Sequence, residues 1–222
     1  MFTAQNKLIE LLEYNPQLIL MLPRFGMKLG FGEKKVEQIC QDNNIPISLF
    51  LLICNAYTFD EYTPSEREIK EIDGNVLINY LIASHDYYLN HRLKHIGKHI
   101  NKIAQEAGDI GTILLKFFHE YEKDVAHHFK NEEENLFPSI KEKLASHSVG
   151  INKINFSHTQ ENIGDKLTDL TNIIIKYLPS EVMSNERIGV WFDIIQLTKD
   201  LEKHTDIEEK ILIPYATLME GD

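Results

Sequence analysis

His128-Phe-Lys-Asn-Glu132 and His204-Thr-Asp-Ile-Glu208 are two copies of one pattern, a histidine followed four residues later by a glutamate. Each copy is followed by a proline ten residues after its histidine, and the copies lie 76 residues apart. On an α-helix, positions i and i+4 lie one turn apart on the same face. Each copy therefore directs an imidazole and a carboxylate into one volume, and two such helices facing each other can hold metal ions.

The composition is that of an ordinary folded protein with an excess of negative charge. Of the 222 residues, 43% are hydrophobic and 26% charged, and the formal net charge is −11. This charge argues against nucleic acid and anionic membrane surfaces as partners, because both need a basic footprint. No membrane span or signal-peptide pattern is recognisable, and Cys40 and Cys54 form no metal or redox motif. We therefore expect a cytoplasmic protein with reduced thiols.

The sequence changes character near residue 60 and again near residue 75. Residues 1–60 contain short helical segments and predict a small helical domain, and the polar, charged residues 61–74 predict a linker. Residues 75–222 show long amphipathic stretches separated by glycine or proline, without the alternation typical of strands. Short connections between long helices favour an all-α fold, an antiparallel up-down four-helix bundle. The four stretches span roughly 75–107, 111–146, 151–178 and 184–219.

The apolar stripes of these stretches point several ionisable side chains into the bundle core. The stripe of the second stretch reaches His128 and Glu132 at helical steps, and the stripe of the fourth reaches its own histidine and glutamate in the same way. The first stripe includes His85, whereas the third is offset from His158 by about one residue. An ionised carboxylate is costly in such positions unless it is paired or metal-bound. The candidate metal ligands are His85, His128, Glu132, His158, His204 and Glu208.

A set of imidazole and carboxylate ligands suits iron, manganese or zinc. Two bridging carboxylates can hold two ions a few ångströms apart, and four histidines can complete their coordination. The alternative is a metal-free bundle with satisfied core histidines and charged edges, since a single His-x-x-x-Glu often arises by chance. Here both copies lie on the core-facing side of their helices, and each precedes a proline at the same spacing. This favours the metal centre, because glutamate is rarely buried without a partner.

Other ionisable residues have weaker patterns. Glu133, Glu134 and Glu209 read as solvated charges, although one of them could orient a histidine ligand from behind. Tyr88 and Tyr121 lie on the apolar stripes and are best explained as packing. Three histidines of the first stretch alternate with lysine and arginine and predict a solvated face: His91, His95 and His99.

These motifs resemble hemerythrin-like di-iron bundles, and the layout is similar to the RIC (repair of iron centres) proteins, which repair iron-sulfur clusters. The resemblance implies a non-haem di-iron centre, bridged by oxide or hydroxide and held by the six candidate ligands, with manganese or zinc as alternatives. Two departures matter. The family's Cys-Cys-Gly-Gly-like turn is best matched by Leu29-Gly30-Phe31-Gly32, which has no cysteine. Asn162 stands where oxygen-carrying hemerythrins have a fifth histidine, so the chain resembles the repair type.

The resemblance implies a response to nitrosative or oxidative stress, through iron donation or nitric oxide chemistry at the di-iron site. The partners would be iron-sulfur proteins or small gaseous ligands, NO and O2, and a homodimer is left open. A second hypothesis is a regulatory or binding module that senses O2 or NO. A third, a ferritin-like oxidase or iron store, is disfavoured because such sites usually combine four carboxylates with two histidines.

Overall fold

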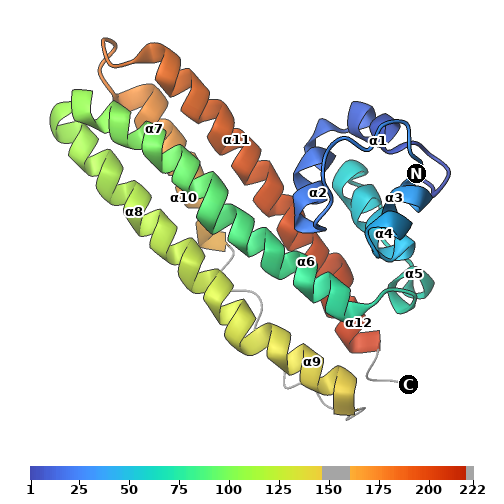
Figure 1. Ribbon diagram of the computed structural model, residues 1–222. Helices are drawn as coiled ribbons and strands as arrows, with labels where there is room; N and C mark the ends of the chain where they lie inside the picture. The colour runs from blue at the N-terminus through green and yellow to red at the C-terminus, as the bar shows by residue number, and fades with distance from the viewer. Residues whose placement is uncertain (147–160, 219–222) are drawn as a thin grey trace. The chain divides into compact units, whose positions relative to one another are not determined.

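The computed structural model describes residues 1–146 and 161–218, and helices joined by turns and loops make up these ranges (Figure 1). No β-strand forms in these two ranges, where Lys7 and Lys35 make one isolated antiparallel bridge. The predicted all-α helical bundle is confirmed. None of the described helices has the length and apolar character that crossing a lipid bilayer requires.

The N-terminal part consists of short helices. Asn15 begins the second of them, where its side chain accepts a hydrogen bond from the Gln17 backbone N–H and Pro16 occupies the first helical position. Ser65 and Glu68 form a capping box at the start of α5. These helices are α1 (Leu8–Tyr14), η1 (Pro16–Leu20), α2 (Met21–Arg24), α3 (Val36–Asp42), α4 (Ile47–Thr58) and α5 (Glu66–Lys70).

The long helices follow the predicted stretches, and each contains a five-residue π-helical turn. The first runs through α6 (Gly74–Tyr87), η2 (Tyr88–Arg92) and α7 (Leu93–Glu106), the second through α8 (Gly108–Asn131), η3 (Glu132–Leu136) and α9 (Phe137–Ser146). The third is described as α10 (Glu161–Asn172) and η4 (Ile173–Tyr177), and the fourth as α11 (Ser184–Ile207), η5 (Glu208–Leu212) and α12 (Ile213–Leu218). The predicted start of the third stretch lies outside the described residues.

The repeated prolines account for two of the π turns. Pro138 and Pro214 each stand two residues after a π turn ends. A proline has no N–H to donate, and its ring clashes with the carbonyl group four residues earlier in a regular α-helix. The wider π turn moves that carbonyl aside, and the N–H groups of Phe137 and Ile213 bond instead to residues five positions back. Those acceptors are Glu132 and Glu208, the two predicted carboxylate ligands, so each glutamate opens a π turn.

By their internal contacts, the described residues divide into two compact units. One comprises Met1–Ser84 and the described parts of Ser139–Gly150 and Lys203–Asp222; the other comprises His85–Pro138 and the described part of Ile151–Glu202. The breaks fall inside continuous helices. The predicted division into a domain at 1–60, a linker at 61–74 and a bundle at 75–222 stays a prediction.

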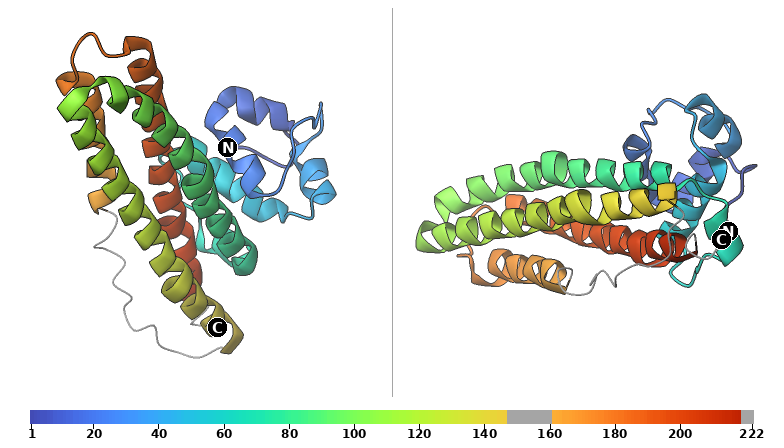
Figure 2. Two further views of the ribbon diagram at one scale, coloured as in Figure 1. Left: turned by 60° about the vertical axis from the view of Figure 1, so that its left-hand side comes forward. Right: turned by 90° about the horizontal axis from the view of Figure 1, so that it is seen from below.

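The second unit has a dense apolar core formed by α7, α8, α10 and α11. The α7 and α8 helices lie side by side and are joined at Gly108, which adopts a positive φ of 57° (Figures 1 and 2). Gly111 lies so close to the Ala104 carbonyl oxygen that a Cβ atom there would overlap it. Fully buried core side chains include Leu114, Phe118, Tyr121, Leu170, Ile174 and Ile194.

Polar side chains of η2 and α7 contact carboxylates of α11 along one edge of this unit. His99 Nδ1 lies 2.6 Å from Glu186 Oε1, and His95 Nε2 lies 3.3 Å from Asp193 Oδ2. Arg92 Nη2 approaches Asp193 Oδ1 at 3.2 Å. The prediction of a solvated face is therefore wrong for His99, whose side chain is 29% exposed and paired across helices.

In the first unit, the N-terminal part of the chain contacts the beginning of α6, Lys203 and α12. The ring of Phe25 lies 4.5 Å from that of Tyr80 on α6. Lys203 Nζ lies 2.7 Å from Asp60 Oδ1, and α5 contacts α12. The segment 61–74, predicted as a linker, thus contains α5, a capped helix with tertiary contacts of its own.

Candidate metal centre

His128 and Glu132 lie one turn apart at the end of α8 and the start of η3. Their side chains continue the stripe that buries Tyr121 and Val125, so both are withdrawn from water, with 6% of each residue exposed. His128 Nε2 lies 3.0 Å from Glu132 Oε1. The i, i+4 spacing of the sequence therefore produces the paired imidazole and carboxylate that it predicts.

The other oxygen of Glu132 faces a second imidazole. His85, on α6, is 1% exposed, and its Nε2 lies 3.3 Å from Glu132 Oε2. The two carboxylate oxygens thus diverge, one toward His128 and the other toward His85. A carboxylate that bridges two metal ions presents its oxygens in this way, with a histidine beside each oxygen.

The distances between these donor atoms fit a metal centre. Two ligand atoms, each ~2.1 Å from one ion and at right angles, lie about 3 Å apart. The Nε2–oxygen separations at Glu132 are 3.0 and 3.3 Å. Burial points the same way, because an ionised carboxylate withdrawn from water needs opposite charge nearby. A bound metal ion would supply such charge, and imidazole and carboxylate groups are ligands that suit iron, manganese or zinc.

His204 and Glu208 repeat this relationship in the fourth long helix. They are 2% and 3% exposed, and His204 Nε2 lies 3.3 Å from Glu208 Oε1. The fully buried Ile211, three residues after Glu208, lies on the same side of the helix. The second copy of the sequence pattern thus has the same local geometry as the first.

The structure gathers four of the six predicted ligands into one buried group. The ligand atoms of His85, Glu132, His204 and Glu208 all lie within 4.8 Å of one another. His128 adjoins this group through its contact with Glu132. His158 lies outside the described residues. The assignment of these side chains as ligands stays a prediction, which the arrangement of the described ones supports.

Glu133 contributes a contact that the sequence pattern left undecided. Its Oε1 lies 2.8 Å from His85 Nδ1, the nitrogen opposite the one that faces Glu132. This contact matches the alternative left open for Glu133, an orienting role behind a histidine ligand, while 41% of its side chain remains exposed. The sequence signal was the doubled glutamate, Glu132-Glu133, which recurs as Glu208-Glu209. The adjacent Glu134 is exposed and approaches Lys130 at 3.7 Å.

Two tyrosines of the same core differ in their hydrogen bonding. The Tyr88 hydroxyl donates to the Asp200 carbonyl oxygen at 3.0 Å. Tyr121, two turns before His128 on α8, is fully buried, and its hydroxyl has no hydrogen-bond partner among the described residues. Burial raises the pKa of the Tyr121 hydroxyl. Both rings serve packing, as predicted, and Tyr121 also brings an unsatisfied polar atom into the core.

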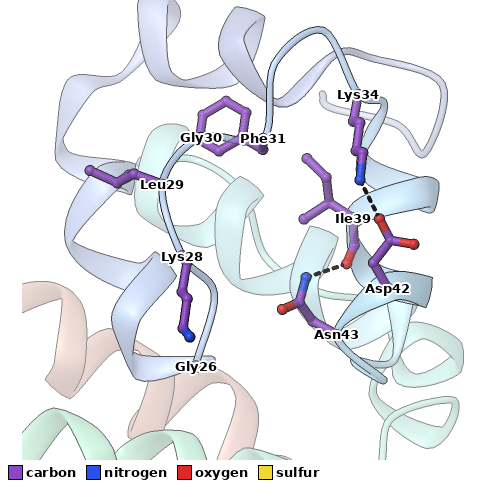
Figure 3. A pocket seen from close by; sticks show the side chains of 9 residues that line it. All are labelled: Gly26, Lys28, Leu29, Gly30, Phe31, Lys34, Ile39, Asp42 and Asn43. Atoms are coloured by element: carbon purple, nitrogen blue, oxygen red, sulfur yellow. Dashed lines mark hydrogen bonds and ion pairs between the residues drawn. The ribbon is translucent and has the colours of Figure 1, made fainter.

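The loop expected to correspond to the family's cysteine turn lines a pocket of about 360 Å³ in the N-terminal part (Figure 3). Gly30 and Gly32 have positive φ values of 93° and 61°, a conformation that favours glycine. The side chains at this turn are Leu29 and Phe31, so it offers no thiol. Cys40 and Cys54 are buried elsewhere, on α3 and α4, and burial raises the pKa of each thiol.

Comparison with known proteins agrees with this site. The model of the hemerythrin HHE cation-binding domain matches residues 77–216, which include every predicted ligand. No curated protein matches the chain.

Proposed function

Because the chain belongs to the hemerythrin HHE cation-binding family, we propose that it holds a non-haem di-iron centre and acts in iron-sulfur cluster repair under nitrosative or oxidative stress. It is a metal-binding, hemerythrin-like protein. The observation that carries the proposal is the buried group of two histidines and two glutamates with ligand atoms within 4.8 Å of one another. Two carboxylates withdrawn from water are costly unless positive charge lies close to them, and a bound cation would supply it.

The residues divide into two roles. Glu132 and Glu208 would bridge the two ions, a role that the diverging oxygens of Glu132 support. His85, His128 and His204 would each bind one ion through Nε2, and the sequence adds His158 as a fourth terminal ligand. When bound, a carboxylate-bridged pair of irons supplies redox chemistry and an open coordination position for a small molecule such as NO or O2.

Aromatic side chains shield the proposed metal site from water. The Phe129 and Phe137 rings cover one side of His85, with ring centroids 4.0 and 5.6 Å away. A site lined in this way admits a small diatomic ligand more readily than a charged one, because desolvating charge is costly. It also strengthens each interaction between the carboxylates and a bound cation.

A sensor or binding module is the second candidate, favoured by one specific observation. The turn at Leu29–Gly32 has no cysteine, so a thiol-dependent step of the N-terminal part is absent from this turn. The centre would then bind NO or O2 and report the binding to a partner protein. Turnover separates the two hypotheses, since a sensor needs stable binding and a repair protein needs reaction or iron release.

The first experiment is elemental analysis of the purified full chain, expressed as metal atoms per chain. About two irons per chain support the proposal, and about one zinc or no metal overturns it. The iron-loaded, reduced protein is then mixed with NO under anaerobic conditions. Release of nitrous oxide, or recovery of an NO-damaged iron-sulfur enzyme, supports the repair function, whereas a stable nitrosyl complex without either result favours the sensor.

A further inference from the structure

Two consecutive glutamates hold opposite nitrogens of one imidazole. Glu133 Oε1 lies 2.8 Å from His85 Nδ1, and Glu132 Oε2 lies 3.3 Å from His85 Nε2. We infer that Glu133 is a positioning residue, which holds the ring proton of His85 on Nδ1 and thereby leaves Nε2 free to bind metal. This inference rests on the proposed function for the metal, but the contact itself belongs to the protein alone.

The π turn explains how neighbouring residues can reach the same ring. In a regular α-helix, consecutive side chains diverge by about 100° around the axis. The i to i+5 hydrogen bonding of a π turn makes the turn wider, so that neighbouring side chains diverge by less. Glu132 and Glu133 are the first two residues of η3, where the Phe137 N–H bonds to the Glu132 carbonyl. Their carboxylates can therefore approach the two edges of His85 from one helix.

Aromatic contacts fix the plane of the His85 ring. Phe129 stacks on it with a centroid separation of 4.0 Å and an interplanar angle of 7°, and Phe137 lies 5.6 Å away at 16°. Stacking of this kind holds the plane of the ring but leaves open which nitrogen points inward and which nitrogen carries the proton. The hydrogen bond to Glu133 settles both, because it places a strong acceptor on the Nδ1 side at the shorter distance.

The two carboxylates compete for the single proton of a neutral imidazole. With Glu133 present, the proton lies on Nδ1, and the lone pair of Nε2 faces the buried metal group. Without Glu133, Glu132 is the nearby acceptor, and the proton moves to Nε2, where it blocks the ligand atom. A carboxylate behind a histidine ligand also increases the basicity of the ring, and loss of such a partner typically weakens metal binding 10- to 100-fold.

The metal experiment uses cobalt(II) as the probe, with chelator competition on the full apoprotein and its variants. We expect Glu133→Ala to weaken cobalt binding about 10- to 100-fold and to change the visible spectrum of the bound ion. Glu133→Gln keeps a neutral acceptor and should recover much of this loss. Glu134→Ala removes the same charge from the same turn and should bind like the wild type. Equal affinities and spectra for the wild type and Glu133→Ala would overturn the inference.

A second experiment examines the metal-free protein. Two-bond proton–nitrogen NMR correlations, recorded where the ring is neutral and assigned with His85→Gln, report which nitrogen of His85 carries the proton. We expect Nδ1–H in the wild type and a shift toward Nε2–H in Glu133→Ala; Nε2–H in the wild type overturns the inference. A wild-type protein that binds no cobalt would contradict the proposed function, and the NMR result would still decide the role of Glu133.

Discussion

The carboxylate of Glu132 and the imidazole of His128 face each other at 3.0 Å in the core of the protein, one turn apart on a single helix. The same carboxylate presents its second oxygen to His85, which comes from another helix. One side chain thus joins a local contact, set by the helix period, to a long-range contact made only on folding. The bridging role proposed for Glu132 depends on these two contacts, one from each carboxylate oxygen.

Replacement of Glu132 by glutamine is the direct test of this relationship. The amide keeps the size of the side chain but cannot bridge two cations with two anionic oxygens, so Glu132→Gln should lose most of its bound iron. The apoprotein should be at least as stable as the wild type, because a buried carboxylate has been neutralised. Elemental analysis and thermal unfolding of the apoprotein measure the two effects. Glu134→Gln is the control, and equal iron content in both variants would contradict a bridging role.

The second copy of the motif predicts the same dependence on Glu208. Its side chain is buried, whereas the adjacent Glu209 is exposed. Glu208→Ala should lose most of the iron while circular dichroism shows an unchanged helical content, and Glu209→Ala should keep more iron than Glu208→Ala. Full retention of iron by Glu208→Ala would remove Glu208 from the site.

Gly111 should tolerate no side chain, because a Cβ atom would overlap the Ala104 backbone oxygen between α7 and α8. Backbone cannot move aside as a flexible side chain can, so Gly111→Ala should lower the free energy of unfolding by about 1–3 kcal/mol. Gly189, on α11, has open space around its Cβ position. Gly189→Ala should therefore raise stability by about 0.5–1 kcal/mol. Chemical denaturation of both apoproteins measures the contrast, and a tolerated Gly111→Ala would mean a looser α7–α8 contact.

Loss of the hydroxyl group should affect the stability of the protein differently at the two core tyrosines. Tyr121→Phe removes a buried polar atom that has no partner among the described residues, so stability should stay equal or rise by up to about 1 kcal/mol. Tyr88→Phe removes a donor to the Asp200 carbonyl oxygen and should cost about 1 kcal/mol. Denaturant titrations of the two apoproteins give the comparison. A destabilised Tyr121→Phe variant would indicate that this hydroxyl has a partner in solution.

The capping box of α5 predicts a dependence of stability on pH. The backbone N–H of Ser65 donates to Glu68, as do the Ser65 and Tyr62 hydroxyl groups, and these hydrogen bonds lower the pKa of Glu68 below its usual 4.5. At pH values above the pKa that the carboxyl has in the unfolded chain, such a carboxylate stabilises the folded protein. This contribution is lost as the pH falls through the pKa that the carboxyl has in the folded protein. Glu68→Gln should therefore be less stable than the wild type at pH 7.

The difference between the wild type and Glu68→Gln should shrink as the pH falls through the lowered pKa of Glu68, because both side chains are neutral below it. Glu66→Gln, in the same first turn of α5, serves as the control for the change of net charge. Urea unfolding at several pH values measures the difference. A gap that stays constant from pH 7 to acid would mean that the capping hydrogen bonds do not depend on the charge of Glu68.

The long helices and the inward-facing ligand residues could be predicted from the spacing of apolar residues along the sequence. The long helices, the inward phase of His128 and Glu132, and the burial of Glu208 follow from apolar residues at helical spacing. The two prolines in equivalent positions mark the π turns that open at the glutamates, although the π geometry itself was not predicted. These features depend on residues within one or two turns of each other, so the order of the residues is sufficient to specify them.

The contacts between distant segments were decided only by the tertiary structure. Glu133 was interpreted as a solvated charge that could orient some histidine ligand, and only the fold shows that it meets His85, 48 positions earlier in the chain. His99 was placed on a solvated face, yet it pairs with Glu186 on α11. Helical periodicity gives the face on which a side chain lies, but it does not give the distance between helices or the side chain that stands opposite. A hydrogen bond forms only within about 3 Å, and that proximity arises when the apolar stripes pack together and set the register of one helix against the next.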